Sequence, residues 1–331
     1  MAWIRALAAQ AEVEHLHVLT LEFSQPDVSL PDNVTVQSMG KEHGVGRGPE
    51  LVAFYRGILR VIRDVDFIFS HMTPRYTWLA APLAFLFRKP QMLWFTHRKV
   101  SVELRAALLA ARWAVTASPE SFPIQSKKVH VMGHGIDTEI FSPNAETESD
   151  ADRALILAVG RISPIKNHHV LLEAAALLKD EPLKFAIAGK PAAPGDEDYQ
   201  QKLLDRCAEL SLSEEKFALA GAQSMDEMVA LYWRASLVVN LSPPGLFDKA
   251  VLEAMLTATP VIVTNAIFDV GDDFLISDAN DPAVVAERIR AVMALSAEER
   301  ARIGAELREK AASAHGLSRL MARIVALAAL K

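Results

Sequence analysis

Apolar runs and amphipathic stretches alternate along almost the whole chain. Short runs rich in β-branched and aromatic residues predict strands, and segments with apolar positions three or four residues apart predict helices. In the first half, strands are expected at 15–21, 34–39, 65–72, 91–97, 113–118 and 128–133, with helices at 50–63, 76–87 and 101–112. In the second half, strands are expected at 154–160, 183–189, 216–222, 236–242 and 260–265, and helical stretches close the chain from 282 to 330. This alternation predicts an α/β fold with parallel sheets.

One polar segment interrupts the pattern. SPNAETESDADR, at 142–153, has the composition of a linker. We therefore expect two doubly wound, Rossmann-like domains facing each other, an N-terminal one at 1–145 and a C-terminal one at 146–316. Helices on both faces of each sheet would explain strands that are apolar at nearly every position.

Composition excludes several classes of protein. Hydrophobic residues make up 51% of the 331 residues and the net charge is −6, which argues against a nucleic-acid binder. Cys207 is the single cysteine, so an internal disulfide and a thiolate metal cluster are excluded, and a reducing, cytoplasmic location is expected. The most apolar run, 76–87, is shorter than the roughly 20 residues that a membrane-spanning helix needs, and predicts a buried core helix.

A first candidate for chemistry is VGRISPIKNHHVLLEA, at 159–174, where two cations follow the end of an expected strand. Gly160 lets the backbone or a ligand come close, Asn167 is expected to cap the following helix, and Arg161 and Lys166 flank the loop between them. Parallel sheets bind ligands beyond the carboxyl ends of their strands. A guanidinium and an ammonium beside a helix N-terminus suit a diphosphate. The alternative is two solvated surface cations.

A second candidate is NLSPPGLFDKAVLEAMLTATPVIVTN, at 240–265, which predicts a strand, a turn, a helix and another strand. Glu253 lies in the N-terminal half of that helix. A carboxylate there would accept hydrogen bonds from both hydroxyls of a ribose.

Together, VGRISPIKN and LEAMLTATPVIV resemble the retaining glycosyltransferases of the GT-B architecture, family 4 (group 1). The likeness extends through FAIAGK and FALAGAQSMDEMVALYWRASLVVNLS, while WFTHR (94–98) and MGHGIDTEIFSP (132–143) are similar to the family's histidine strand and interdomain crossover. It implies two domains across a cleft, with a C-terminal helix at 317–331 that packs back on the first.

The resemblance also implies an activity. A protein of this family is a hexosyltransferase-type enzyme that transfers a sugar with retention of the anomeric configuration, in processes such as polysaccharide biosynthesis. The donor is a nucleotide-diphosphate sugar, the acceptor is a saccharide or a lipid-linked sugar, and no metal or other cofactor is expected.

Residue by residue, the resemblance implies that Arg161 and Lys166 hold the diphosphate and offset the charge on the leaving group. Glu253 would bind the ribose, and His97 would contact the donor sugar near the reacting carbon. The implied catalytic residues are His97, Arg161 and Lys166. The implied donor-binding residues are Gly160, Arg161, Lys166, Gly189, Asp248, Lys249 and Glu253. His71 and His134, at strand ends of the first domain, are candidates for lining the cleft.

The sequence departs from the family in two places. The first glutamate of the family's E-x7-E motif falls at Gly245, which has no carboxylate. We hypothesise that Asp248 takes over its contact with the sugar hydroxyls while Lys249 adds a phosphate contact; alternatively, Asp248 only caps the helix. The chain also begins inside the family's first helix, so we expect either an upstream strand and glycine-rich loop or a first domain that lacks them. Both departures favour an alternative function, a nucleotide-sugar-binding protein with little or no activity.

Three further features have more ordinary explanations. The glycine-rich MGKEHGVGRG, at 39–48, fits neither the dinucleotide fingerprint nor the GxxxxGK[ST] phosphate loop. It predicts a disordered connection or, alternatively, a mobile loop over the acceptor side.

Arg56, Arg60 and Arg63 share one helical face, which predicts a solvated surface. The alternative is peripheral contact with anionic lipid at the cytoplasmic membrane, or with a lipid-linked acceptor. His168 and His169 are adjacent on a helix and face different ways, which is poor geometry for a metal.

Overall fold

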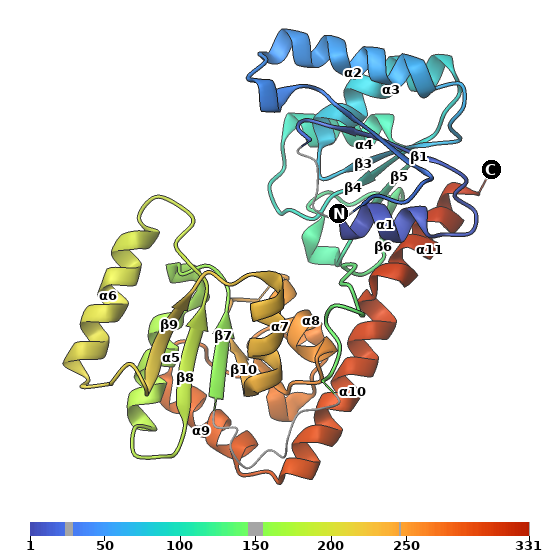
Figure 1. Cartoon of the computed structure of the whole chain (residues 1–331). Coiled ribbons are helices and arrows are strands. Elements are labelled where there is room, and N and C mark those ends of the chain that lie inside the picture. The colour runs from blue at the N-terminus through green and yellow to red at the C-terminus, as the bar shows by residue number, and fades with distance from the viewer. Residues whose placement is uncertain (24–28, 145–154, 245, 331) are drawn as a thin grey trace. The chain divides into compact units, whose positions relative to one another are not determined.

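The computed structural model describes residues 1–23, 29–144, 155–244 and 246–330 (Figure 1). They form two compact units, Met1–Asp137 with His315–Lys331, and Thr138–Ala314. The break at Asp137 precedes the polar segment from which a boundary at 145 is expected.

The second unit is built on a parallel sheet whose strand order, in the described residues, is β11-β10-β7-β8-β9. Its strands are β7 (Leu155–Val159), β8 (Lys184–Ala188), β9 (Phe217–Gly221), β10 (Ala235–Asn240) and β11 (Val261–Val263). Its helices are α5 (His168–Leu177), α6 (Asp196–Glu209), α7 (Met225–Arg234), α8 (Lys249–Leu256), α9 (Pro282–Met293) and α10 (Ala297–His315). β7 pairs with β8 on one side and β10 on the other. The order of strand addition therefore reverses between β7 and β10, and open α/β sheets bind ligands at such a switch point.

Alternate residues of β7 explain why its sequence is apolar throughout. Ile156 and Ala158 belong to a buried core that α5, α6 and α9 complete on one face of the sheet. Leu157, fully buried, points to the opposite face, where α7 contacts both β7 and β10. With helices on both faces, a strand has no position that favours a polar residue.

The first unit contains two parallel ladders. One pairs β1 (Leu16–Thr20) with β2 (Val34–Ser38), and the other joins β3 (Ile68–His71), β4 (Gln91–Trp94), β5 (Trp113–Thr116) and β6 (Val129–Val131) in that order. The helices are α1 (Ala2–Ala8), α2 (Arg47–Val61), α3 (Pro74–Leu86), α4 (Val102–Ala110) and α11 (Leu317–Ala328). The two ladders are not hydrogen-bonded to each other in the described residues.

Both faces of the second ladder are covered. Trp94 of β4 belongs to a buried cluster with Leu320 and Ile324 of α11. Leu93, its neighbour on the strand, belongs instead to a cluster with Leu104 of α4. The last helix of the chain therefore covers one face of this sheet, and α4 covers the other.

Two expectations were wrong in detail. The glycine-rich segment 39–48 is an ordered connection: a 3₁₀ helix spans Lys41–His43, and α2 begins at Arg47. Gly40 and Gly44 adopt φ of +90° and +68° on either side of that turn, a conformation that glycine adopts at no steric cost. Likewise α3 is only partly a core helix, because Phe85 at its end is 88% exposed.

No described helix combines the length and the apolar character that crossing a membrane would require.

We expect Gly304→Ala to destabilise the second unit, although alanine favours helices. Gly304 lies inside α10, and a Cβ there would stand 2.0 Å from the carbonyl oxygen of Ala258. The neighbouring chain would have to move, which costs about 1–3 kcal/mol in an overpacked core. The control is Gly48→Ala in α2, where nothing beyond the chain neighbours lies within 4 Å of the new Cβ and where only the restriction imposed by the following Pro49 opposes the change, so we expect a smaller loss. Chemical denaturation measures both, and an equal or larger loss for Gly48→Ala would contradict this packing.

Candidate functional site

Two glycines let the ends of β7 and β8 approach each other closely. Gly160 follows β7 with φ +146°, and a Cβ there would lie 3.3 Å from Cε of Lys166. Gly189 follows β8 with φ +156°, and its Cβ would lie 1.8 Å from the carbonyl oxygen of Gly160. The backbone N–H of Gly160 donates to Ala188 at 3.0 Å, so the two strands stay paired up to this point. Gly189 therefore has no room for a side chain, and a side chain at Gly160 would crowd Lys166.

Asn167 acts differently from its predicted role as a cap. It occupies the N-cap position of α5 with φ 52°, but its side chain makes no capping hydrogen bond. Its Nδ2 instead donates to the carbonyl oxygen of Leu241, just past β10, at 3.1 Å. The loop after β7 is thereby tied to the loop after β10, across the switch point.

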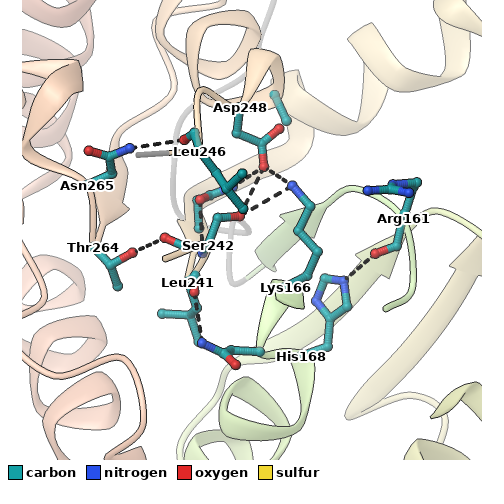
Figure 2. A network of polar contacts seen from close by, with 12 residues as sticks. Arg161, Lys166, His168, Leu241, Ser242, Leu246, Asp248, Thr264 and Asn265 are labelled. Carbon is teal, nitrogen blue, oxygen red and sulfur yellow. Dashed lines mark hydrogen bonds and ion pairs between the residues drawn. The ribbon is translucent and has the colours of Figure 1, made fainter. Parts of the chain in front are cut away.

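Lys166 and Asp248 form a buried ion pair at this switch point (Figure 2). Oδ2 of Asp248 accepts from the Lys166 ammonium, from Nδ2 of Asn240 at 2.7 Å and from Oγ of Ser242 at 3.2 Å. The side chains of Lys166 and Asp248 are only 13% and 11% exposed. Asp248 stands at the N-cap position of α8 without a capping hydrogen bond, so the capping alternative is wrong. Lys166 is not the solvated surface cation of the other alternative.

His168 fixes the backbone beside these cations. Its Nε2 lies 3.1 Å from the carbonyl oxygen of Arg161. A carbonyl only accepts, so this nitrogen carries the proton. Burial, helped by the nearby charge of Lys166, lowers the pKa of His168 to about 4, and the ring is therefore neutral near pH 7. The guanidinium of Arg161 itself is exposed to solvent.

Glu253 is held by a tyrosine that the sequence did not single out. The hydroxyl of Tyr232, a residue with no exposed surface, donates to Oε2 of Glu253 at 3.0 Å. Burial raises the pKa of Glu253, and the nearby Asp248 raises it further, whereas the Tyr232 hydrogen bond and Lys249 lower it. The carboxylate is therefore oriented by Tyr232 and partly desolvated, and its pKa depends on Asp248 and Lys249 at the start of α8.

The structure brings the second-unit candidates to one edge of the sheet. Gly160, Arg161 and Lys166 follow β7, Gly189 follows β8, and Asp248, Lys249 and Glu253 follow β10. A small hollow between the ends of β7 and β10 is lined by Lys166, His168, Asn240 and Ser242 among others. Gly245 lies outside the described residues.

The remaining candidates belong to the first unit. His97 is exposed beyond β4, and its Nδ1 accepts from the backbone N–H of Lys99 at 3.0 Å. The ring of His71, at the end of β3, lies 4.5 Å from that of Trp3. His134 is buried and its backbone N–H donates to His315 at 3.2 Å. The described residues contain no group of three or more histidine, cysteine or acidic side chains that could hold a metal ion.

Comparison with known proteins gives the family. The model of the glycosyl transferases group 1 family matches residues 142–310. The chain therefore belongs to the glycosyl transferases group 1 family. Its parallel α/β architecture resembles solved GT-B structures, such as Anabaena HepE in complex with UDP and glucose (TM-score 0.69, 17% identity, 96% of this chain and 100% of that one).

Two curated relatives of this group 1 member are D-inositol 3-phosphate glycosyltransferases. The protein from Corynebacterium urealyticum is 31% identical over 51% of this chain and 44% of its own length. The protein from Mycolicibacterium gilvum is 27% identical over 76% of this chain and 65% of its own length. The chain thus spans about half to two thirds of the curated relatives that it matches.

We expect Tyr232→Phe to enlarge the loss of stability that Glu253 causes as the pH rises. The pKa of Glu253 in the folded chain lies above its ordinary value of 4.5, so folding favours the protonated acid. Its contribution is therefore fully present below pH 4.5 and is lost as the pH rises through the folded pKa. Without the tyrosine hydroxyl this pKa rises further, and the loss extends to higher pH.

The measurement is the free energy of unfolding between about pH 4 and pH 8, taken relative to Glu253→Gln, which does not titrate. The same Tyr232→Phe change in the Glu253→Gln background serves as the control. An identical pH dependence with and without the hydroxyl would show that Tyr232 does not act on the carboxylate.

Proposed function

We propose that the chain is a retaining, family 4 hexosyltransferase that moves a sugar from a nucleotide-diphosphate donor to a saccharide or lipid-linked acceptor. The observation that carries the proposal is the arrangement at the switch point, where Arg161, Lys166 and Glu253 follow neighbouring strands of one sheet. The printed descriptions of relatives support it: HepE binds UDP and glucose, and the curated relatives glycosylate an inositol phosphate.

In this proposal the two cations after β7 bind the diphosphate. Arg161 supplies a planar fork and Lys166 a point charge, and both stabilise the negative charge that builds on the leaving group without a metal. Gly160 and Gly189 leave room for the phosphates to approach the backbone, because neither position holds a side chain. Exposed Lys249, the first residue of α8, adds a further phosphate contact.

The carboxylates bind hydroxyls. Glu253 accepts from the ribose, since Tyr232 occupies one of its oxygens and leaves other lone pairs on the carboxylate. Asp248 accepts from a hydroxyl of the transferred sugar, in place of the carboxylate that Gly245 lacks. His97 of the first unit is the residue that the family resemblance assigns to the donor sugar.

A second candidate is a protein that binds the nucleotide sugar with little or no transfer. Gly245 favours it, because the usual first carboxylate of the motif is absent from the sequence. Donor hydrolysis separates the two candidates, since a transferase without acceptor still passes some donor sugar to water.

We expect one of UDP, GDP or ADP to stabilise the protein, by about 2.7 kcal/mol at 100 times its dissociation constant. Lys166→Ala should weaken that binding at least about tenfold, because it removes a charge-assisted contact to phosphate. The matched control is Lys184→Ala at the opposite end of β8, where an exposed pair with Glu215 contributes little. Thermal shift and calorimetric titration measure both. If the wild-type chain binds none of the three nucleotides, the proposed function fails.

We also propose peripheral contact of the first unit with anionic lipid, through three exposed arginines, Arg56 and Arg60 in α2 and Arg63 just after it. Each cation near an anionic surface contributes about 1 kcal/mol, so changing all three to glutamate should weaken vesicle binding at least about a hundredfold. Co-sedimentation with phosphatidylglycerol vesicles measures it. The control reverses three exposed cations of the second unit, Lys184, Arg302 and Lys310. Equal binding by both variants would leave α2 with an ordinary solvated face.

A further inference from the structure

The ammonium that the proposed function assigns to the donor already holds an anion. Lys166 contacts Asp248 and lies 3.3 Å from Oγ of Ser242, in a position that is mostly shielded from water. A diphosphate that reached Lys166 would bring further negative charge close to the Asp248 carboxylate. Two like charges a few ångströms apart in a partly buried site repel each other much more strongly than they would in water. Lys166 therefore cannot hold both anions at full strength.

We infer that Asp248 is a built-in substitute for the diphosphate: it holds Lys166 while the site is empty and gives up the ammonium when a nucleoside diphosphate binds. The inference rests on the proposed function. It adds a role for Asp248, which would make the site prefer the intact donor over the product nucleotide.

The neighbours of Asp248 make the exchange feasible. Oδ2 also accepts from Asn240 and Ser242, so the carboxylate keeps two hydrogen bonds after the ammonium has left. Lys249, next in the chain and exposed, offers a second positive charge nearby. Loss of the Lys166 contact therefore does not leave a buried, uncompensated charge, the condition that makes breaking most buried ion pairs costly.

The exchange has a consequence for the order of events. A sugar hydroxyl on the donor gives the released carboxylate a new hydrogen bond, whereas a nucleoside diphosphate without its sugar gives it none. After transfer, Asp248 competes with the product for Lys166. The site thus favours the intact donor over the product nucleotide and promotes release of the product.

A pair that only stabilised the fold would behave differently. Exposed pairs such as Arg206–Glu173, 43% and 33% exposed, lie away from the switch point and would not respond to nucleotide. Lys166–Asp248 instead links the loops on the two sides of the switch point, so any anion placed there meets it.

The test compares dissociation constants of the wild-type chain and Asp248→Asn, by calorimetric titration with the nucleoside diphosphate that binds in the panel of UDP, GDP and ADP. Asn keeps the size of the side chain and removes the competing charge. We expect Asp248→Asn to bind the nucleoside diphosphate at least about fivefold more tightly, because the variant lacks the carboxylate charge that repels the phosphates. The corresponding nucleoside without phosphates should bind equally to both, and the gain should be smaller for the sugar nucleotide.

Two further variants keep the test decisive. Ser242→Ala removes one of the two hydrogen bonds that the Asp248 carboxylate keeps after the ammonium has left. It should therefore weaken binding of the nucleoside diphosphate, which tests the inference even if Asp248→Asn does not fold. Glu214→Gln removes an exposed charge before β9, at the opposite end of the sheet, and should change nothing.

The outcomes separate the two claims. If the wild-type chain binds no nucleoside diphosphate, the proposed function fails. If it binds one, but Asp248→Asn binds it equally or more weakly, the exchange is overturned while the proposed function stands. A gain in Glu214→Gln as large as that in Asp248→Asn would reduce the effect to net charge and overturn the exchange as well.

Discussion

One carboxylate oxygen connects the two loops on which the site depends. Oδ2 of Asp248 accepts from Lys166 in the loop after β7 and from Asn240 and Ser242 at the end of β10. β7 and β10 are neighbours in the sheet but 80 residues apart in sequence (155 and 235 at their first residues), so no local interaction positions their loops together. Asn167 adds a second tie, to Leu241. Sheet pairing brings the two strand ends together, and charge and hydrogen bonding then tie the loops that follow them.

Most of the fold could be predicted from the sequence because its strands are buried on both faces. A strand such as β7 (LILAV), covered by helices on both faces, produces an uninterrupted apolar run that stands out between amphipathic segments. The predicted α/β class with parallel sheets is confirmed. One error fell where conformation depends on backbone dihedral angles rather than on polarity. At 39–48, the left-handed Gly40 and Gly44 form an ordered turn, whereas their composition alone suggested disorder.

The candidate site was predictable in position but not in its contacts. Strand ends in a parallel sheet converge by topology, which is why Arg161, Lys166 and Glu253 could be expected on one edge. The partner of each side chain depends on tertiary distances that a pattern does not contain. Tyr232 reaches Glu253 from another helix, and His168 reaches back to Arg161 from within α5. A local signal was the polar pair Asn167–His168 at the start of an apolar helix; on the sequence alone, His168 and His169 are only poor metal ligands and have no other predicted role.

The ionisable groups of the site divide according to burial, and the division has a physical consequence. Lys166 and Asp248 are shielded and neutralise each other, and burial keeps His168 uncharged and favours the protonated form of Glu253. Arg161 and Lys249, by contrast, are exposed at the rim. The Lys166–Asp248 pair thus carries little net charge while Arg161 and Lys249 are positive at the rim, so an approaching anion is attracted by charges that cost little to rearrange. Only in the interior does a ligand have to replace an existing partner, and there its own hydrogen-bonding groups decide whether the replacement is favourable.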